Sequence, residues 1–355
     1  MSERLNKAAE QILKKKAVDE AKLEREYLKL KKSEEQAEKV AKASLSAIED
    51  LSKSDDYLGS LINDMEKDLS LLQKATHFIS DELNEVAPLI PGQITMIGAI
   101  SGTGKSTIAA AIAHSHYKSN KKVLIISNEE KAVRVYSRIA CAELDKSFNH
   151  FQLGRYNHHE KLEIYREIRK IINYVKIVDD PIISTTVESV VKTLYEAANY
   201  DIAIIDFLNR ISKSTEMVGA TTTDVLYHFK NLLTDYTQHS TMPVVVMAQL
   251  KDLSYTEKER DIENRIKWCK GFYEACQNVL EAIRLDGIPA TTFYVQKTRF
   301  GDIRAWLTHE FYYGKFSYIG LKRLHELKDI RKNAEIQDQL EELQSTSDDN
   351  EDIAI

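Results

Sequence analysis

The sequence contains little cysteine, proline or glycine: its 355 residues include three cysteines, five prolines and 12 glycines. Cys141, Cys269 and Cys276 have no CxxC spacing, which argues against a zinc site and against a disulfide framework. No apolar run approaches the roughly 18 residues that a membrane span needs. The first residues are charged, unlike those of a secretory leader. We therefore expect no membrane partner and a reducing, cytoplasmic setting, in a bacterium or a phage-infected host.

An excess of basic charge is also missing. The chain has 49 lysines and arginines against 55 acidic residues, a formal net charge of -6. This balance excludes a generally basic protein that coats nucleic acid, but it allows a local basic channel. The length suits one large domain with extensions at its ends.

The N-terminal region has the composition of exposed helices. Residues 1–55 are rich in Lys, Glu, Ala and Leu with charges of both signs, which predicts a long charged helix or a coiled coil that binds a partner. In residues 56–75, apolar side chains recur every three or four positions, which predicts an amphipathic linker helix. Its apolar face must pack on something, either on its own domain or on a neighbouring subunit.

Residues 76–320 alternate between apolar runs typical of strands and helical patterns. The predicted strands cover residues 93–98, 122–127, 174–179, 201–207, 242–249, 278–283 and 291–297. This order predicts an α/β domain with a mostly parallel, twisted sheet whose faces are covered by helices. Residues 321–355 predict a short helix followed by an acidic, disordered tail, whose final "DIAI" also suits a docking peptide.

A phosphate-binding loop is the strongest motif. The stretch "GAISGTGKST" (residues 98–107) follows a predicted strand and precedes a predicted helix, although Ala99 stands where the P-loop pattern has glycine. Gly102 and Gly104 let the backbone approach phosphate oxygens, and the N–H groups around them supply a positive field. Lys105 suits the β- and γ-phosphates, and the Ser106 hydroxyl suits Mg²⁺. We expect contacts to the nucleotide from Ser101, Gly102, Thr103, Gly104, Lys105, Ser106 and Thr107, with Thr107 also capping the helix.

Polar side chains end three further strands. Asp206 follows four apolar residues and is expected to support Mg²⁺, whereas the bland alternative is a helix-capping Asp. Glu129 and Glu130 end the second strand, where a carboxylate can orient and deprotonate water, or be an ordinary surface acid. Gln249 ends the strand "PVVVMAQ" and can sense the γ-phosphate through its amide.

Together these motifs resemble the RecA-like core of the hexameric replicative DNA helicases, the DnaB type and the phage primase–helicases. In that family, alanine also replaces the first P-loop glycine, as at Ala99. The stretches "SNEE", "IIDFLNRI" and "MPVVVMAQLKDL" are similar to the family's "SLEM", "IDYLQ" and "PVVALSQLNR", and "QKTRFGD" resembles its "KQRNG". The family's usual N-terminal domain is missing from this resemblance.

The resemblance implies ATP and Mg²⁺ as cofactors and roles for several residues. Glu129 would be the catalytic acid, with Arg138 nine residues later beside the nucleotide. Lys297 and Arg299 would reach the γ-phosphate of the neighbouring subunit, where an arginine finger stabilises transition-state charge. The implied partners are single-stranded DNA, further copies of the chain in a hexameric ring, and a polymerase, primase or loader bound through the N-terminal helix or the acidic tail.

Two loops are candidates for contact with nucleic acid. Residues 209–224 include Arg210 and Lys213. The cations of residues 251–270 include Lys251, Lys258, Arg260, Arg265 and Lys267. Both loops follow strand ends, where α/β sheets bind ligands, and cationic side chains there can track phosphates. Two other functions stay open: a RecA-fold ATPase of recombinase or regulatory type that does not unwind, and a nucleotide-gated assembly factor.

Overall fold

The computed structural model describes residues 56–206, 208–212, 217, 219–251, 271–299, 304–320, 322–329 and 331. The predicted helix over residues 1–55, nearly all of the loop 251–270 and the predicted acidic tail lie outside these residues. The chain divides into two units, Met1–Leu71 and Leu72–Ile355. The helix α2 (Asp56–Gln73) fulfils the prediction of an amphipathic helix, and its Leu61, Met65 and Leu69 are each about half exposed.

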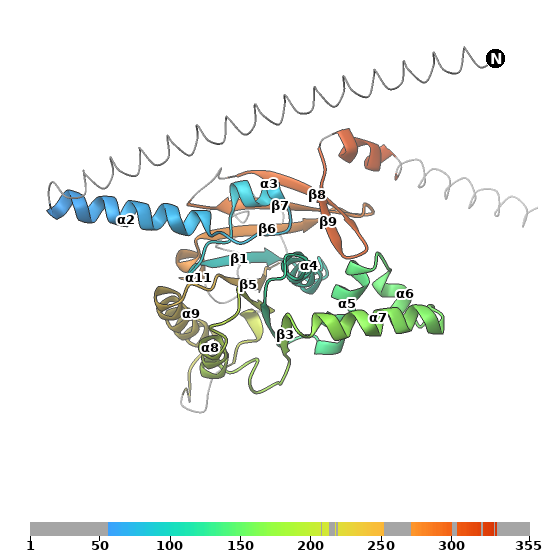
Figure 1. The fold of residues 1–355 in the computed structure, drawn as a ribbon, viewed down its shortest axis with the longest axis horizontal. Coiled ribbons are helices and arrows are strands. Elements are labelled where there is room, and N and C mark those ends of the chain that lie inside the picture. The colour runs from blue at the N-terminus through green and yellow to red at the C-terminus, as the bar shows by residue number, and fades with distance from the viewer. Residues whose placement is uncertain are drawn as a thin grey trace, which may run out of the picture. The chain divides into compact units, whose positions relative to one another are not determined.

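The described part of the second unit contains a nine-stranded sheet in the order β3-β2-β4-β5-β1-β6-β7-β8-β9 (Figure 1). The strands are β1 (Ile94–Ala99), β2 (Val123–Ser127), β3 (Val175–Val178), β4 (Ile202–Asp206), β5 (Val244–Gln249), β6 (Asn278–Arg284), β7 (Ala290–Lys297), β8 (Trp306–Tyr312) and β9 (Lys315–Tyr318). The first six in spatial order are parallel, and β7, β8 and β9 are antiparallel. The predicted mostly parallel α/β sheet is confirmed.

All seven predicted strands are present, but the sequence prediction missed β8 and β9. These two strands form a hairpin at the sheet edge and carry mixed polar and aromatic residues, most of them partly exposed. They therefore lack the continuous apolar run that marks a strand covered on both faces.

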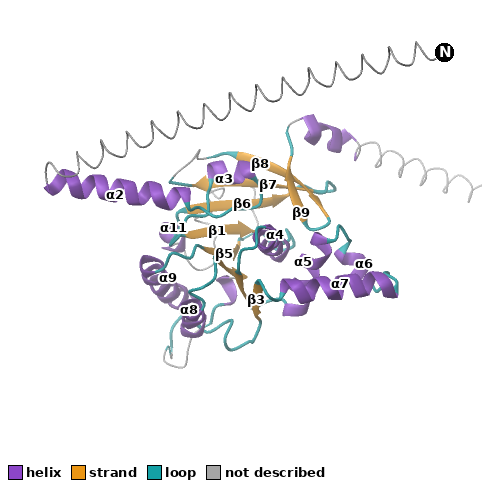
Figure 2. Ribbon diagram, viewed as in Figure 1, coloured by secondary structure: helices purple, strands orange, loops and turns teal. Residues whose placement is uncertain are grey.

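Helices cover both faces of the sheet, as Figure 2 shows. The helices are α3 (Asp81–Val86), α4 (Lys105–Lys118), α5 (Ala132–Glu143), α6 (Phe148–Gln152), α7 (His158–Ile171), α8 (Val187–Glu196), α9 (Thr222–His239) and α11 (Gly271–Ala275), with a 3-10 turn η1 (Leu208–Arg210). Alternate residues of β2 divide between the two cores. Val123 and Ile125 join the core that includes α4 and α5, whereas Leu124 and Ile126 join the core that includes α8 and α9.

Two buried histidines fix the segment that leads into β1. His116 on α4 bonds the Thr76 hydroxyl at 2.8 Å, and His309 on β8 bonds the Ser80 hydroxyl at 2.8 Å. Burial lowers the pKa of each histidine to about 4. Both rings are therefore neutral near pH 7. No helix in the described part of the chain is long and apolar enough to span a bilayer.

Candidate functional site

Four parallel strands end at one edge of the sheet. The register places Ser127 of β2 beside Asp206 of β4, and Ala99 of β1 beside Gln249 of β5. The loops after all four strands therefore leave from the same edge, which we call the carboxyl edge. Parallel sheets of this type bind their ligands there.

The phosphate loop has the backbone that its glycines predicted. Gly102 and Gly104 have φ angles of 81° and 97°, a region that other residues adopt at a cost. An added Cβ on Gly102 would meet nothing within 4 Å, so conformation rather than space requires glycine at this position. Lys105 is buried, and its Nζ donates to the Ile100 carbonyl at 3.5 Å.

The prediction that Thr107 caps this helix was wrong. Helix α4 begins at Lys105 with Gly104 as its N-cap, and no side chain caps it. Because Thr107 is the third residue of the helix, it lies inside the first turn. Its hydroxyl instead accepts a hydrogen bond from Arg138 Nη1 at 3.2 Å.

Asp206 has the surroundings of a metal-supporting carboxylate. It is 2% exposed, and its Oδ1 has no hydrogen-bond partner among the described residues. Burial raises the pKa of Asp206 to about 6, against the opposing effect of a hydrogen bond from Ser106, and the charges of Glu129 and Glu130 raise it further. A hard cation with oxygen ligands would satisfy the unpaired oxygen and offset this charge. The Ser106 hydroxyl and the Asp206 carboxylate therefore fit Mg²⁺.

The two adjacent glutamates after β2 have different surroundings. Glu129 is exposed at the carboxyl edge, whereas Glu130 pairs with Arg138 at 2.6 Å and is 15% exposed. The Arg138 guanidinium also lies 4.3 Å from the centre of the Phe148 ring. Arg138 thus links Glu130 to the phosphate-loop helix through Thr107. The sequence did not assign this role to Glu130, because the eight-residue spacing crosses from a loop into α5.

Gln249 lies half-buried at the end of β5. Its backbone N–H donates to Asn209 Oδ1 at 2.6 Å, which ties the end of β5 to the turn after β4. The predicted sensor position therefore stands between the phosphate loop and the first candidate nucleic-acid loop.

Lys297 and Arg299 do not join the other site residues within one chain. Because β7 is antiparallel to β6, Lys297 pairs with Val279, and Val279 pairs with Met96 of β1. Met96 precedes the strand end at Ala99 by three residues, and Arg299 lies two residues beyond Lys297. At about 3.3 Å per residue, Arg299 is roughly 16 Å below the carboxyl edge.

The contacts of the two cations differ. Lys297 Nζ donates to the carbonyls of Tyr273 and Glu274 at 2.9 and 3.0 Å, whereas Arg299 is exposed. We call the end of the sheet that carries both cations the amino edge.

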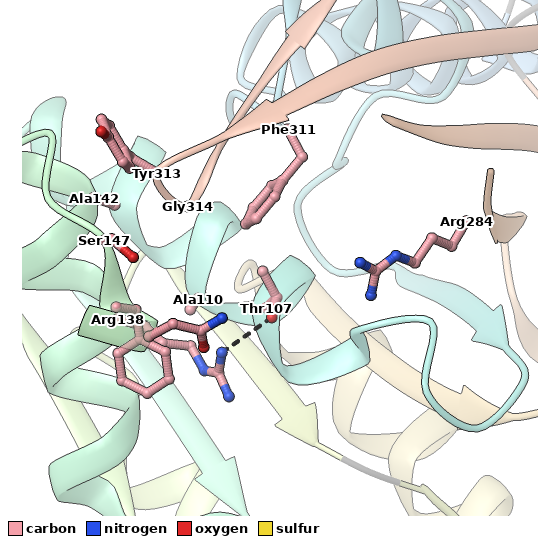
Figure 3. Close-up of a pocket in the computed structure, with 11 residues that line it drawn as sticks. Thr107, Ala110, Arg138, Ala142, Ser147, Arg284, Phe311, Tyr313 and Gly314 are labelled. Carbon is pink, nitrogen blue, oxygen red and sulfur yellow. Dashed lines mark hydrogen bonds between the residues drawn. The ribbon is translucent and has the colours of Figure 1, made fainter. Parts of the chain in front are cut away.

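A cavity of about 320 Å³ adjoins the phosphate-loop helix (Figure 3). Arg138 and Arg284 flank Thr107, and Phe311 and Tyr313 enter from the hairpin of β8 and β9. Tyr313 has a φ of 47°, an uncommon conformation for a non-glycine residue. The turn lies close to α5, because a Cβ on Gly314 would stand 3.0 Å from the Ala142 Cβ. The sequence prediction missed Arg284, Phe311 and Tyr313, since they converge only through the unpredicted hairpin.

Residues 75–263, more than half of the chain, match the model of the DnaB-like helicase C-terminal domain. The chain belongs to this family. The resemblance predicted from the motifs is therefore confirmed, and the protein is a RecA-fold ATPase of the replicative-helicase type. The part that matches the DnaB-like family includes Lys105, Glu129, Asp206 and Gln249, whereas Arg299 lies beyond it.

Curated relatives and solved structures are more distant. The DNA repair protein RadA of Mycobacterium tuberculosis, from strains CDC 1551 and H37Rv, is 25% identical over 166 residues. That match covers 42% of this chain, and the chain spans about a third of the RadA length, 35%. Among solved structures, a helicase ATPase domain aligns with a TM-score of 0.61 at 15% identity, over 74% of this chain and 98% of that one.

A DnaB-like replicative helicase, solved in a study of its interactions with primase, also aligns. Its TM-score is 0.61 at 15% identity, over 79% of this chain and 71% of that chain. At this identity, both structures establish the shared fold. The predicted RecA-like architecture is thus confirmed independently of the motifs.

Proposed function

We propose that this chain is an ATP-driven, ring-shaped replicative DNA helicase that translocates on single-stranded DNA and unwinds duplex. The observation that carries the proposal is the separation of the site into two halves. The phosphate loop, Glu129 and Asp206 lie at the carboxyl edge, and Lys297 and Arg299 lie at the amino edge. A head-to-tail contact between copies brings unlike edges together, and such contacts close into rings.

The carboxyl edge would hold ATP and Mg²⁺. The backbone N–H groups of the phosphate loop and Lys105 would bind the β- and γ-phosphates, while Ser106 and Asp206 would hold the metal. Bound Mg²⁺ neutralises charge that develops on the phosphates. The cavity between Arg138 and the hairpin of β8 and β9 adjoins the same helix, and its arginine and aromatic lining suits a nucleobase and ribose.

Three further residues would complete the reaction. Glu129 would orient the attacking water and accept its proton. Gln249 would relay the state of the γ-phosphate to the turn after β4 through its bond to Asn209. Arg299 of a second copy would stabilise the transition state, with Lys297 beside it.

Complementation between two inactive variants tests the shared site. A Lys105→Ala chain lacks phosphate binding, and an Arg299→Ala chain lacks the finger, so each alone should hydrolyse ATP very slowly. In mixed rings, some interfaces join an intact Lys105 to an intact Arg299 of the next copy. We expect the mixture to regain ATP hydrolysis and fork unwinding. Activity that stays at the level of the separate variants in verified mixed assemblies would contradict the shared site.

Nucleic acid and protein partners follow from the same proposal. The loops 209–224 and 251–270 would track single-stranded DNA at the carboxyl edge, and the ring would be hexameric, in a bacterial or phage-infected cytosol. One structural neighbour interacts with primase. We extend this to a primase, polymerase or loader that binds the N-terminal helix or the acidic tail.

A second candidate is a RecA-fold ATPase of DNA repair or recombination, which the sequence match to RadA favours. Strand-exchange assays separate the two candidates. A helicase unwinds forks and does not exchange strands between homologous duplexes, whereas a recombinase shows the opposite pattern.

A further inference from the structure

The peptide that precedes Glu129 is held from three directions. The Asn128 N–H donates to the Asp206 carbonyl at 2.9 Å, and the Asn128 side chain donates to the Ser184 carbonyl at 3.4 Å. The Asn128 carbonyl accepts a bond from Arg210 Nη1 at 3.3 Å. Because the peptide group is planar, the position of this oxygen also fixes the amide nitrogen of Glu129. Arg210 therefore helps to set the direction in which Glu129 leaves the strand.

The backbone around Arg210 is fixed on both sides. Asn209 Oδ1 accepts the bond from the Gln249 N–H, and the Ser212 N–H donates to the Thr185 carbonyl at 2.7 Å. The Arg210 side chain is nevertheless exposed, at the start of a candidate nucleic-acid loop. A fixed backbone that presents an exposed guanidinium suits the recognition of a phosphate.

We propose that Arg210 couples single-stranded nucleic acid to ATP hydrolysis by exchanging the Asn128 carbonyl for a backbone phosphate of the strand. The inference rests on the proposed function and adds a positioning residue to it. Bonds from guanidinium to phosphate are charge-assisted and stronger than bonds to a neutral carbonyl. The bond to Asn128 is long for an N–H···O contact, so a phosphate competes with it effectively.

The exchange changes the restraint on Glu129 without moving the phosphate loop. When the phosphate takes Arg210, the carbonyl of Asn128 is released and the peptide before Glu129 gains rotational freedom. The bonds of Asn128 to Asp206 and Ser184 keep the segment in place. A nucleic-acid contact at Arg210 thus changes the position of the water-activating acid through a single peptide group.

The test uses the full chain as wild type, Arg210→Gln and Arg210→Lys, with Arg155→Gln as the matched control. Arg155 is an exposed arginine next to α6, outside the proposed machinery. The kcat for ATP is measured without nucleic acid and with saturating oligo-dT, and the affinity for oligo-dT is measured separately by fluorescence anisotropy. Melting temperatures establish that each variant folds.

We expect Arg210→Gln to lower the ratio of stimulated to unstimulated kcat by about tenfold, which corresponds to about 1.4 kcal/mol. The KM for ATP should change little, because Arg210 acts through Asn128. Arg210→Lys should keep part of the stimulation, since it retains the charge but loses the planar fork. Arg155→Gln should keep the wild-type ratio.

A wild-type ratio in Arg210→Gln at saturating oligo-dT would overturn the coupling, even if its affinity for oligo-dT fell, because Arg210 would then be an ordinary phosphate contact. In that case the helicase proposal would stand, since the wild type would still respond to the strand. A wild type that hydrolyses ATP without any response to oligo-dT would overturn both the coupling and the helicase proposal.

Discussion

The adjacent glutamates 129 and 130 should separate stability from catalysis. Glu130→Gln leaves the Arg138 guanidinium without its carboxylate partner, in a pair whose side chains are only 15% and 20% exposed. A hydrogen bond to a charged group contributes about 1.5–3 kcal/mol, and exposed ion pairs contribute about 0–1 kcal/mol. Since this pair is mostly buried, we expect a loss of about 2 kcal/mol in the free energy of unfolding.

The loss should be visible in thermal unfolding. A domain of this size changes its melting temperature by about 2–4 °C per kcal/mol, so Glu130→Gln should lower it by roughly 4–8 °C. Glu129→Gln is the matched control, with the same chemistry at an exposed position, and should change stability by less than about 0.5 kcal/mol. The order should reverse for catalysis, because removal of a general base costs roughly 10²–10⁴ in rate.

Calorimetry and steady-state ATP hydrolysis on the two variants test this reasoning. A double variant with Arg138→Met should show a coupling energy of about 1.5–2 kcal/mol with Glu130. Equal melting temperatures for the two single variants, or a larger loss of ATP turnover in Glu130→Gln than in Glu129→Gln, would refute it.

Three further predictions concern pH, metal and backbone. His116 and His309 have a folded pKa of about 4 against about 6.5 in the unfolded chain, so their contribution is complete above pH 6.5 and is lost as the pH falls toward 4; urea unfolding between pH 7 and 4.5 should show the loss, at up to about 1.4 kcal/mol per pH unit and histidine. The raised pKa of Asp206 destabilises the metal-free fold above pH 6, so Asp206→Asn should stabilise it at pH 7.5 by about 1–3 kcal/mol and abolish the added stability that Mg²⁺ with ATP gives the wild type in a thermal shift assay. Gly314→Ala places a methyl group 3.0 Å from the Ala142 Cβ at a φ of 85°, so it should cost about 1–3 kcal/mol in chemical unfolding, whereas Gly102→Ala, which meets nothing within 4 Å, should cost about 1–2 kcal/mol from backbone strain alone.

The sequence predicted the fold where burial leaves a strong pattern. Strands such as β2 and β5 are covered on both faces, so their apolar runs are continuous and their bounds agree with the prediction to within two residues. The hairpin of β8 and β9 has one weakly covered face, and side chains such as Trp306 and Tyr312 remain exposed. Its pattern resembles that of a loop, and the prediction missed it.

The site divides in the same way. Lys105, Ser106 and Asp206 stand in local motifs whose spacing is tied to their chemistry, and the structure places them at one edge of the sheet. Contacts between distant elements leave no such spacing, which is why the bond of Arg138 to Thr107 and the approach of Tyr313 became visible only in three dimensions. The placement of Arg299 at the opposite edge depends on the strand order, which the sequence did not specify.

Electron microscopy of the chain with a non-hydrolysable ATP analogue and single-stranded DNA tests the central proposal most directly. We predict a closed ring in which Arg299 of each copy approaches the γ-phosphate bound at Lys105 of the next, with the strand against the loops of the carboxyl edge. An open filament, or a ring whose copies meet through like edges so that Arg299 is remote from every nucleotide, would contradict the account.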